Sequence, residues 1–292
     1  MKTEVNRNAE VYIMMEDYMF KFEPHEIENR WAVYKKPKDL YDVIRERLDL
    51  IEKEKRRYED EMLEEQERYR KTFESTEKVI RNFHTNNSVS SHESVMKMCT
   101  EIMSTLNSLT EQSRKFNSRE ILFGRDQTDY QRLAIIIKDF TPYNTLWSIV
   151  NRWYTDIDIW MDNQFGNIDA NAAEKFVEES FRSIITANKY FKDRSMGQIV
   201  AIGEKVRQEM EKFKPNLPLM VALRKDGMKE RHWSEVSKLA GIEINPQEEG
   251  FTFRKILNMG LIKHVDACVE IGEKASKEYN IETMLKEMWK IW

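Results

Sequence analysis

The sequence has few of the residues that break helices or connect short strands. Its 292 residues include nine glycines and six prolines, the residue types that many tight turns require. This scarcity argues against a fold of many short strands and favours long helices. The two cysteines, Cys99 and Cys268, lie far apart in the sequence. A disulfide framework is therefore not expected, and the composition fits a reducing compartment.

Features that would indicate a membrane or nucleic-acid partner are also missing. No run approaches the roughly 20 apolar residues that a membrane span needs, and the polar N-terminus lacks the apolar core of a signal peptide. The formal net charge is −4, with both signs mixed throughout, so no basic face for nucleic acid is indicated. We therefore predict a soluble protein that binds neither a membrane nor a nucleic acid.

The sequence shows no motif for catalysis, cofactor binding or metal binding. The stretches nearest to a phosphate-binding loop begin at Gly197 and Gly272, but the first has the wrong spacing and the second places Glu273 before its lysine. None of the five histidines pairs with another at i, i+4, and no cysteine lies at ligand spacing. Carboxylates are spread along charged faces, where choosing a catalytic pair would be arbitrary. We predict no catalytic residue, cofactor or metal within this segment.

What the sequence does contain is helical periodicity. Residues 38–84 include neither Gly nor Pro, and we expect Pro37 to open a helix of roughly 70 Å. Lys55 and Glu65 interrupt its apolar stripe, and two successive steps of four at Tyr69 form a stutter. The helix either lies on a bundle with its charged face solvated or pairs in a two-chain coiled coil. The stripe has heptad-like spacing and consists of Ile44, Leu48, Ile51, Tyr58, Met62, Tyr69, Phe73, Ile80 and Phe83.

Helical spacing continues through the rest of the chain. A helix over about 92–116 is expected to pack antiparallel to the long helix as a hairpin. Pro142 is expected to break the next helical stretch, and Trp147, Trp153 and Trp160 to be buried anchors. The predicted fold class is all-α, an elongated multi-helix bundle with a long helical hairpin followed by the start of a helical arm. Its segments are a polar, aromatic-rich stretch (1–36), the hairpin (37–125), a helical bundle (126–214) and the arm (215–292).

Helix breakers cluster in the last third of the chain. Pro215 and Pro218 are expected to bracket a short extended link, and Gly227 to form a turn. Hinges need a few residues that absorb changes in dihedral angle, so Pro215, Pro218 and Gly227 are the candidate hinge residues. Two final helices are expected over 263–279 and 281–292. The last has neither a cap nor a polar tail, which indicates a piece of a longer chain.

Several stretches of the chain are distinctive as an ordered set: FNSREILFG (116–124), KDFTPYNTLW (138–147), WMDN (160–163), PNLPLMVALRKDGMKERHW (215–233) and KHVDACVEIGEKASKEYNIETML (263–285). In this order, and over nearly the whole chain from about Phe20, they resemble the dynein heavy chain family. Residues 215–233 are similar to the start of that family's linker, with Lys225-Asp226 where Asn-Pro is usual. The stretch 160–163 looks closer to the axonemal branch than to the cytoplasmic one.

This resemblance implies a mechanical role. The chain would run from the end of the dynein tail into the N-terminal part of the linker (215–292), an α-helical arm that crosses the AAA+ ring. It would couple ATP-driven changes in the ring to the tail during minus-end-directed motility along microtubules. The fragment itself would not be an enzyme. ATP and Mg would be bound elsewhere in the parent heavy chain.

The resemblance also implies partners and a location. The partners would be the rest of the same heavy chain, dynein intermediate and light chains, and neighbouring heavy chains. The microtubule would be contacted only through distant regions. The location would be the cytoskeleton, with the axoneme of a cilium or flagellum favoured over the general cytoplasm.

Two other interpretations stay open on the residues alone. A helical coiled-coil adaptor or scaffold without motor function would dimerise through residues 44–83 and would respond to polar substitutions at Ile51 and Met62. An enzyme with an unrecognised site would need a pocket that holds strongly shifted titrating groups.

Overall fold

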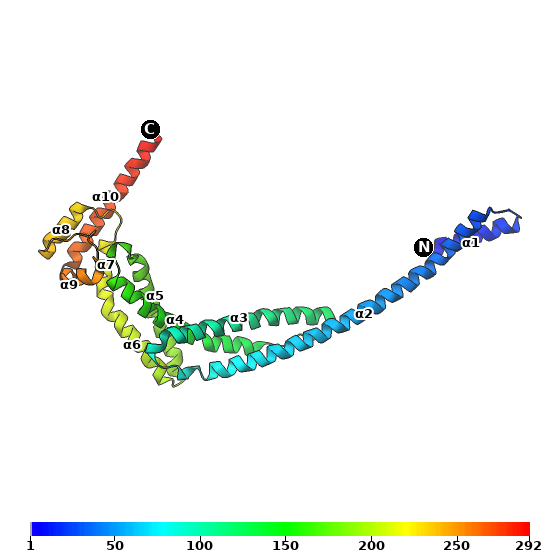
Figure 1. The fold of residues 1–292 in the computed structure, drawn as a ribbon, viewed down its shortest axis with the longest axis horizontal. Coiled ribbons are helices and arrows are strands. Elements are labelled where there is room, and N and C mark those ends of the chain that lie inside the picture. Colours follow the sequence, from blue (N-terminus) through cyan, green and yellow to red (C-terminus); the bar gives the residue numbers. More distant parts are fainter. Residues whose placement is uncertain (1) are drawn as a thin grey trace. The chain divides into compact units, whose positions relative to one another are not determined.

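The computed structural model describes residues 2–292, and every regular element in that range is a helix (Figure 1). The one β-type pairing in the range is an isolated bridge between Gln164 and Thr252. The predicted all-α class is confirmed. None of the helices described combines the length and the apolar character that a bilayer crossing requires. The α-helices are α1 (Lys2–Asp17), α2 (Pro24–Arg81), α3 (His92–Phe123), α4 (Gln131–Asp162), α5 (Ala170–Asp193), α6 (Gly197–Phe213), α7 (Leu217–Leu223), α8 (Glu230–Ala240), α9 (Phe253–Asn258) and α10 (Val265–Ile291).

The chain forms two compact units, which are described separately below. The first contains residues up to 72 together with 112–128, and the second contains 73–111 together with 129–292. Helices α2 and α3 therefore each contribute one part to each unit. The segment boundaries predicted from the sequence stay predictions.

Helix α2 begins earlier than the sequence pattern suggested. It starts at Pro24, and Pro37 lies inside it, so the predicted start at Pro37 is wrong. Pro24 fits the first turn equally well, because no intrahelical N–H is needed there. The carboxylate of Glu26 also accepts the backbone N–H of Glu23 at 2.9 Å, which is half of a capping box. An interior proline costs about 3 kcal/mol or more, and the long helix continues through it.

In the first unit, both neighbours of α2 are held by aromatic and charged contacts. The guanidinium of Arg30 on α2 pairs with Glu16 of α1 and lies 5.0 Å from the ring centroid of Tyr12. Further along α2, the ring of Tyr69 meets that of Phe116 on α3 edge-on, with centroids 5.7 Å apart. Higher residue numbers on α3 face lower numbers on α2, so these two helices run antiparallel.

Glu120 closes the end of the α2–α3 pair in the first unit. Its side chain is 4% exposed, and its carboxylate accepts the backbone N–H of Thr128 at 2.8 Å, the Thr128 hydroxyl at 2.6 Å and the amide of Gln66 at 2.7 Å. Burial by itself raises the pKa of Glu120, but these hydrogen bonds favour the carboxylate more strongly and hold the pKa below its usual value. The loop after α3 is thereby tied back onto both helices.

The core of the second unit is rich in aromatic rings. Phe83 meets Phe140 edge-on with centroids 5.2 Å apart. Trp153 and Trp160 of α4 lie 6.1 Å apart, and each is within 6 Å of the ring of Phe213. The predicted burial of Trp147, Trp153 and Trp160 is confirmed. Cys99 is fully buried as well, and burial raises the pKa of its thiol to about 12.

Helix α4 runs unbroken through Pro142, so the predicted break there is wrong. The residues on both sides of the proline are anchored in the core, because Phe140, Tyr143 and Leu146 are all buried. Packing of these side chains on one face outweighs the hydrogen bond that a proline removes. Tertiary contacts decide the outcome where local propensity predicts a boundary.

Replacing Glu120 with Ala should loosen the end of the α2–α3 pair, because the Thr128 N–H, the Thr128 hydroxyl and the Gln66 amide would all lose their acceptor. We expect a loss of about 1–3 kcal/mol in the free energy of unfolding. The Glu120 carboxylate has a lower pKa in the folded chain than in the unfolded chain. Its contribution is therefore present above about pH 4.3 and is lost as the pH falls through the folded pKa.

Urea denaturation of wild type and Glu120→Ala at neutral pH and at about pH 3 measures this difference. Asp60→Ala, on the exposed surface of α2, is the control. Equal urea midpoints for Glu120→Ala and Asp60→Ala at neutral pH would contradict the assignment.

Candidate functional site: the joint of α7, α8 and α10

The candidate hinge residues lie at the two ends of the short helix α7. Pro215 belongs to a 3₁₀ turn, Lys214–Asn216, and Pro218 lies in the first turn of α7. Lys214, Asn216 and Leu217 all have right-handed helical dihedral angles. The predicted extended link between Pro215 and Pro218 is therefore wrong. Proline fixes a φ that suits a first helical turn, so two prolines here start a helix instead of preventing one.

Helix α7 is held by burial of most of its residues. Those buried are Leu217, Leu219, Met220, Ala222 and Leu223. The helix packs against α5 and α10 within the second unit (Figure 1). Leu217, which lies inside the predicted extended link, is therefore part of the core.

The contact between α7 and α10 is made through backbone atoms. A Cβ atom placed on Gly272 of α10 would lie 2.5 Å from the carbonyl oxygen of Ala222 and 3.1 Å from its carbonyl carbon. Those neighbours are backbone atoms and cannot swing away as a side chain would. The two helices can approach this closely only because residue 272 has no side chain.

Gly227, the third hinge candidate, lies against the same helix. Its φ of +94° is in the left-handed region, where residues with a side chain are strained. A Cβ there would also lie 2.5 Å from Cβ of Tyr279 and 2.6 Å from the carbonyl oxygen of Ala275. The structure thus brings Gly227 and α7, which contains Pro218, together on α10, whereas Pro215 lies one turn earlier, beside the end of α6.

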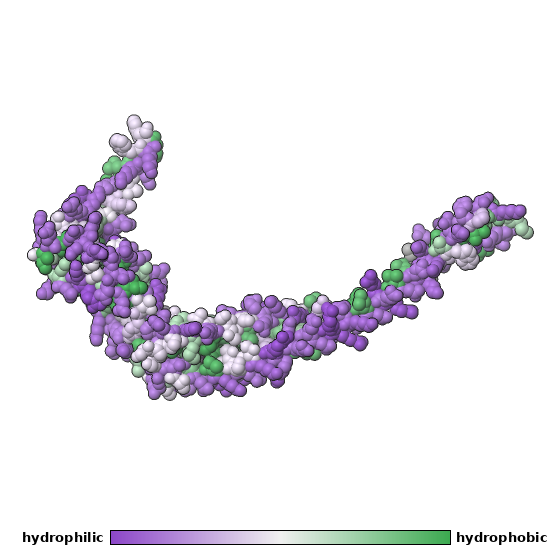
Figure 2. All heavy atoms as spheres, viewed as in Figure 1, coloured by the Kyte–Doolittle hydropathy of each residue, from purple (hydrophilic) through white to green (hydrophobic). Residues whose placement is uncertain are grey.

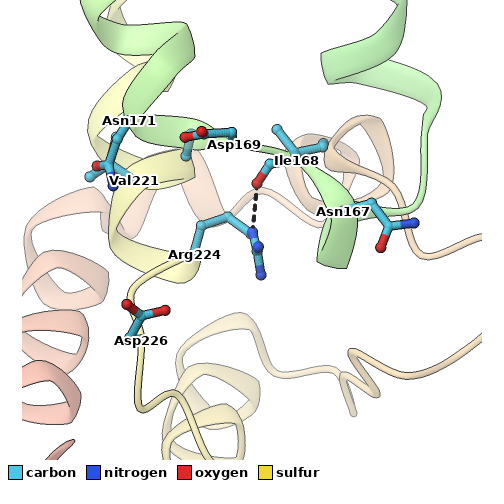
Figure 3. Close-up of a pocket in the computed structure, with 8 residues that line it drawn as sticks. Asn167, Ile168, Asp169, Asn171, Val221, Arg224 and Asp226 are labelled. Carbon is cyan, nitrogen blue, oxygen red and sulfur yellow. Dashed lines mark hydrogen bonds between the residues drawn. The ribbon is translucent and has the colours of Figure 1, made fainter.

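Arg224, which caps α7, ties the joint to α5. Its Nε donates to the carbonyl oxygen of Ile168 at 2.8 Å (Figure 3). The neighbouring Asp169 caps α5 by accepting the N–H of Ala172 at 3.0 Å. A small pocket of about 270 Å³ lies beside these residues, lined also by Asn171 and Asp226. The described residues contain no group of three or more His, Cys, Asp or Glu side chains placed to hold a metal ion.

A buried histidine connects α8 to α10. The side chain of His232 is fully buried, and its Nδ1 accepts the backbone N–H of Lys229 at 3.1 Å. Nε2 therefore carries the ring proton, and it lies 3.0 Å from Oε2 of Glu278. The same carboxylate accepts from Arg231, and this guanidinium holds the pKa of Glu278 below its usual range.

Two further ion pairs join α8 and its cap to α10. Lys229 pairs with Glu282, and Lys274 pairs with Glu235 at 2.9 Å. Each lysine holds the pKa of its carboxyl partner below the usual range. Single exposed pairs add little stability, but together with His232 they fix the angle at which α8 lies on α10.

Helix α10 is continuous from Val265 to Ile291, so the predicted division into two final helices is wrong. Neither Gly272 nor His232 was identified as important from the sequence. Gly272 carried one usable signal, since an isolated glycine inside a helical pattern often marks a close approach of another backbone. His232 carried none, because its partner Glu278 is far away in the sequence.

Gly272→Ala should force α7 and α10 apart. We expect the free energy of unfolding to fall by about 1–3 kcal/mol, because a methyl group would overlap the Ala222 carbonyl. Urea denaturation monitored by tryptophan fluorescence measures the change. Gly197→Ala is the matched control, since its added Cβ would meet nothing within 4 Å. An equal urea midpoint for the two variants would show that the contact is not tight.

Comparison with known proteins gives one consistent answer. A family model described as "Dynein heavy chain, N-terminal region 2" matches residues 133–292, a range that contains the whole joint. "Dynein axonemal heavy chain 1" of Mus musculus is 29% identical over 284 residues, which is 96% of this chain and 6% of that protein. "Dynein axonemal heavy chain 2" of Mus musculus is 27% identical over 201 residues, 69% of this chain and 4% of that protein.

A further relative is more distant but also covers most of the chain. "Dynein axonemal heavy chain 12" of Rattus norvegicus is 23% identical over 265 residues, 88% of this chain and 8% of that protein. The chain spans 8% or less of the length of each of these three curated relatives. Because the family model covers more than half of the sequence, the chain belongs to the dynein heavy chain family, with residues 133–292 in its N-terminal region 2.

Proposed function

We propose that the chain is a non-catalytic mechanical segment of a dynein heavy chain. It couples ATP-driven changes in the AAA+ ring to the tail during minus-end-directed motility along microtubules. The observation that carries this proposal is the backbone contact at Gly272, inside the range that matches the dynein family. A displacement of α10 passes to α7 through backbone atoms, and close-packed interiors of this kind resist compression.

Bending takes place at the two ends of α7. The supporting observation is a contrast in burial, because Lys214, Pro215 and Pro218 are exposed whereas Leu219 and Met220 are fully buried. Helix α7 therefore stays seated on α10 while α6 changes direction about Pro215 and Pro218. A change in the direction of α8 about Gly227 also requires its contacts with α10, through His232 and the ion pairs, to open. Short terminal segments of this type absorb the dihedral changes of a hinge.

The parent heavy chain supplies what this segment does not. ATP and Mg bind in its AAA+ ring, and the microtubule is contacted through distant regions. The partners of the segment are the rest of the same heavy chain, the intermediate and light chains, and neighbouring heavy chains. The location is the axoneme of a cilium or flagellum, which the axonemal names of the relatives support.

The alternative is a helical coiled-coil adaptor or scaffold without motor function. The observation that favours it is the exposed apolar stripe on α2, where Leu48 and Ile51 are both solvent-accessible. The two functions differ in what lies beyond the chain, since only the motor requires an ATPase in a C-terminal extension.

The proposed function predicts where ATPase activity lies. This chain alone should neither bind nor hydrolyse ATP, and a version extended C-terminally through the ring should show turnover that microtubules stimulate. Nucleotide binding is followed by equilibrium titration with a fluorescent ATP analogue, and turnover by phosphate release. Specific hydrolysis by this chain alone would overturn the proposal, and a ring-length extension without turnover would favour the adaptor.

Hydrogen exchange tests the position of the hinges. Backbone amides of residues 225–228 should exchange at least about tenfold faster than those of the buried part of α10 around Cys268 and Ala275, because residues 225–228 lie outside the helices and can open without unwinding one. Lys214 and Asn216 should behave like 225–228. Mass spectrometry of peptides that cover each segment gives the rates. If the amides of both segments were as protected from exchange as those of α10, the proposed hinge positions would be wrong.

A further inference from the structure

The middle of α2 is a helix without a neighbour in the first unit. Every residue from 41 to 53 is exposed. The apolar side chains along one face of this stretch and just beyond it are between 44% and 61% exposed: Tyr41, Ile44, Leu48, Ile51 and Tyr58. Figure 2 shows apolar surface on α2 between the part that packs on α1 and the part that packs on α3.

The exposed residues continue an interface that is already formed. The stripe advances in alternating steps of three and four, which places Leu48, Met62 and Tyr69 at one core position of the heptad and Ile44 and Ile51 at the other. Met62 and Tyr69 are buried where α3 covers α2. Arg125, which follows α3 in the chain, forms an ion pair with Glu59 of α2. N-terminal to Glu59, the same stripe is exposed to solvent.

The charges beside the bare stripe have a polarity along the helix. The positions that flank the core residues hold Arg45 and Arg47 in the first half and Glu52 and Glu54 in the second. Opposite charges at flanking positions determine the partner and its direction in paired helices. A segment that is basic at one end and acidic at the other is complementary to a copy of itself running the other way.

We propose that residues 41–58 form an antiparallel pair with the same segment of a second copy of this chain. The two-fold axis passes between Leu48 and Ile51, so that Leu48 packs against Ile51 of the second copy. Moving outward on each side, Ile44 faces Lys55 and Tyr41 faces Tyr58. Arg45 then lies beside Glu52 of the second copy, and Arg47 beside its Glu54.

The charges also favour this direction over a parallel pair in register. A parallel pair would keep an attractive contact of Arg47 with Glu52 of the second copy. It would also place Lys55 against Lys55 in the core and Glu54 beside Glu59, and both of these contacts are repulsive. In the antiparallel pair, the aliphatic part of Lys55 covers Ile44 while its ammonium group reaches water. The pair has only six layers of facing core residues, so the fraction of paired chains should depend on protein concentration. Its flanking charges are exposed, so salt should weaken the association.

Charge reversal tests the pairing in the full 292-residue chain. Arg45→Glu/Arg47→Glu and Glu52→Arg/Glu54→Arg should each weaken self-association at least tenfold, because like charges then face each other. A mixture of the two variants should associate again, because every flanking pair becomes attractive. Sedimentation velocity over roughly a hundredfold range of concentration measures each equilibrium.

Lys53→Glu/Arg56→Glu is the matched control, because it changes the net charge as Arg45→Glu/Arg47→Glu does but on the outer face of the helix. Its association should equal that of the wild type. A wild-type chain that stays monomeric over the whole concentration range would overturn the proposal, as would equal weakening by the control. Either result would indicate that a helix other than a second copy of residues 41–58 packs on the stripe.

Disulfide trapping tests the direction. In a mixture of Leu48→Cys and Ile51→Cys chains, mild oxidation should give mainly the mixed disulfide, because those positions face each other across the axis. The native Cys99 and Cys268 are buried and should stay reduced. Dominant Leu48→Cys homodimers would indicate a parallel pair and overturn the antiparallel one.

Discussion

The close approach of α7 and α10 depends on one missing side chain, that of Gly272. Because its neighbour is a backbone carbonyl, any side chain at that position would move a whole helix instead of a rotamer. The rest of the joint follows from this approach. Gly227 can meet Ala275 and Tyr279 only when α7 ends where it does, and Arg224 reaches Ile168 from the same helix end. The contacts of α8 with α10 then set the direction in which the chain leaves the joint, through the buried His232 and the ion pairs around it.

Prolines in this chain illustrate the difference between local rules and packing. Pro24, Pro215 and Pro218 all lie in first turns, where the absent N–H costs nothing. Pro142 lies inside a helix and is tolerated because side chains on both sides of it are buried in the core. Pro37 lies inside α2, where the surrounding side chains are largely exposed, so core packing does not explain it. A proline therefore indicates where a helix can start, but not whether it does.

The long stripe of α2 has two different environments. Near Met62 and Tyr69 it is covered by α3, and the buried carboxylate of Glu120 closes that end of the pair. Near Leu48 the same periodicity faces solvent, with flanking charges that fit a copy of the segment running the opposite way. Continuity of the stripe across both environments explains why two interpretations of this helix, packing on a bundle and pairing between chains, both fitted the sequence.

The sequence by itself determined the all-α class, the buried role of Trp147, Trp153 and Trp160, and the resemblance to the dynein heavy chain family. These properties follow from residue periodicity, composition and the order of motifs. All three can be read along the chain without knowing which distant residues are in contact. It also singled out Pro215, Pro218 and Gly227, but not what they touch. Only the tertiary structure decided that α7 is a packed helix, that Gly272 admits the Ala222 carbonyl, and that His232 reaches Glu278. The physical reason is that these contacts join residues far apart in sequence, whose proximity depends on helix directions that no local pattern encodes.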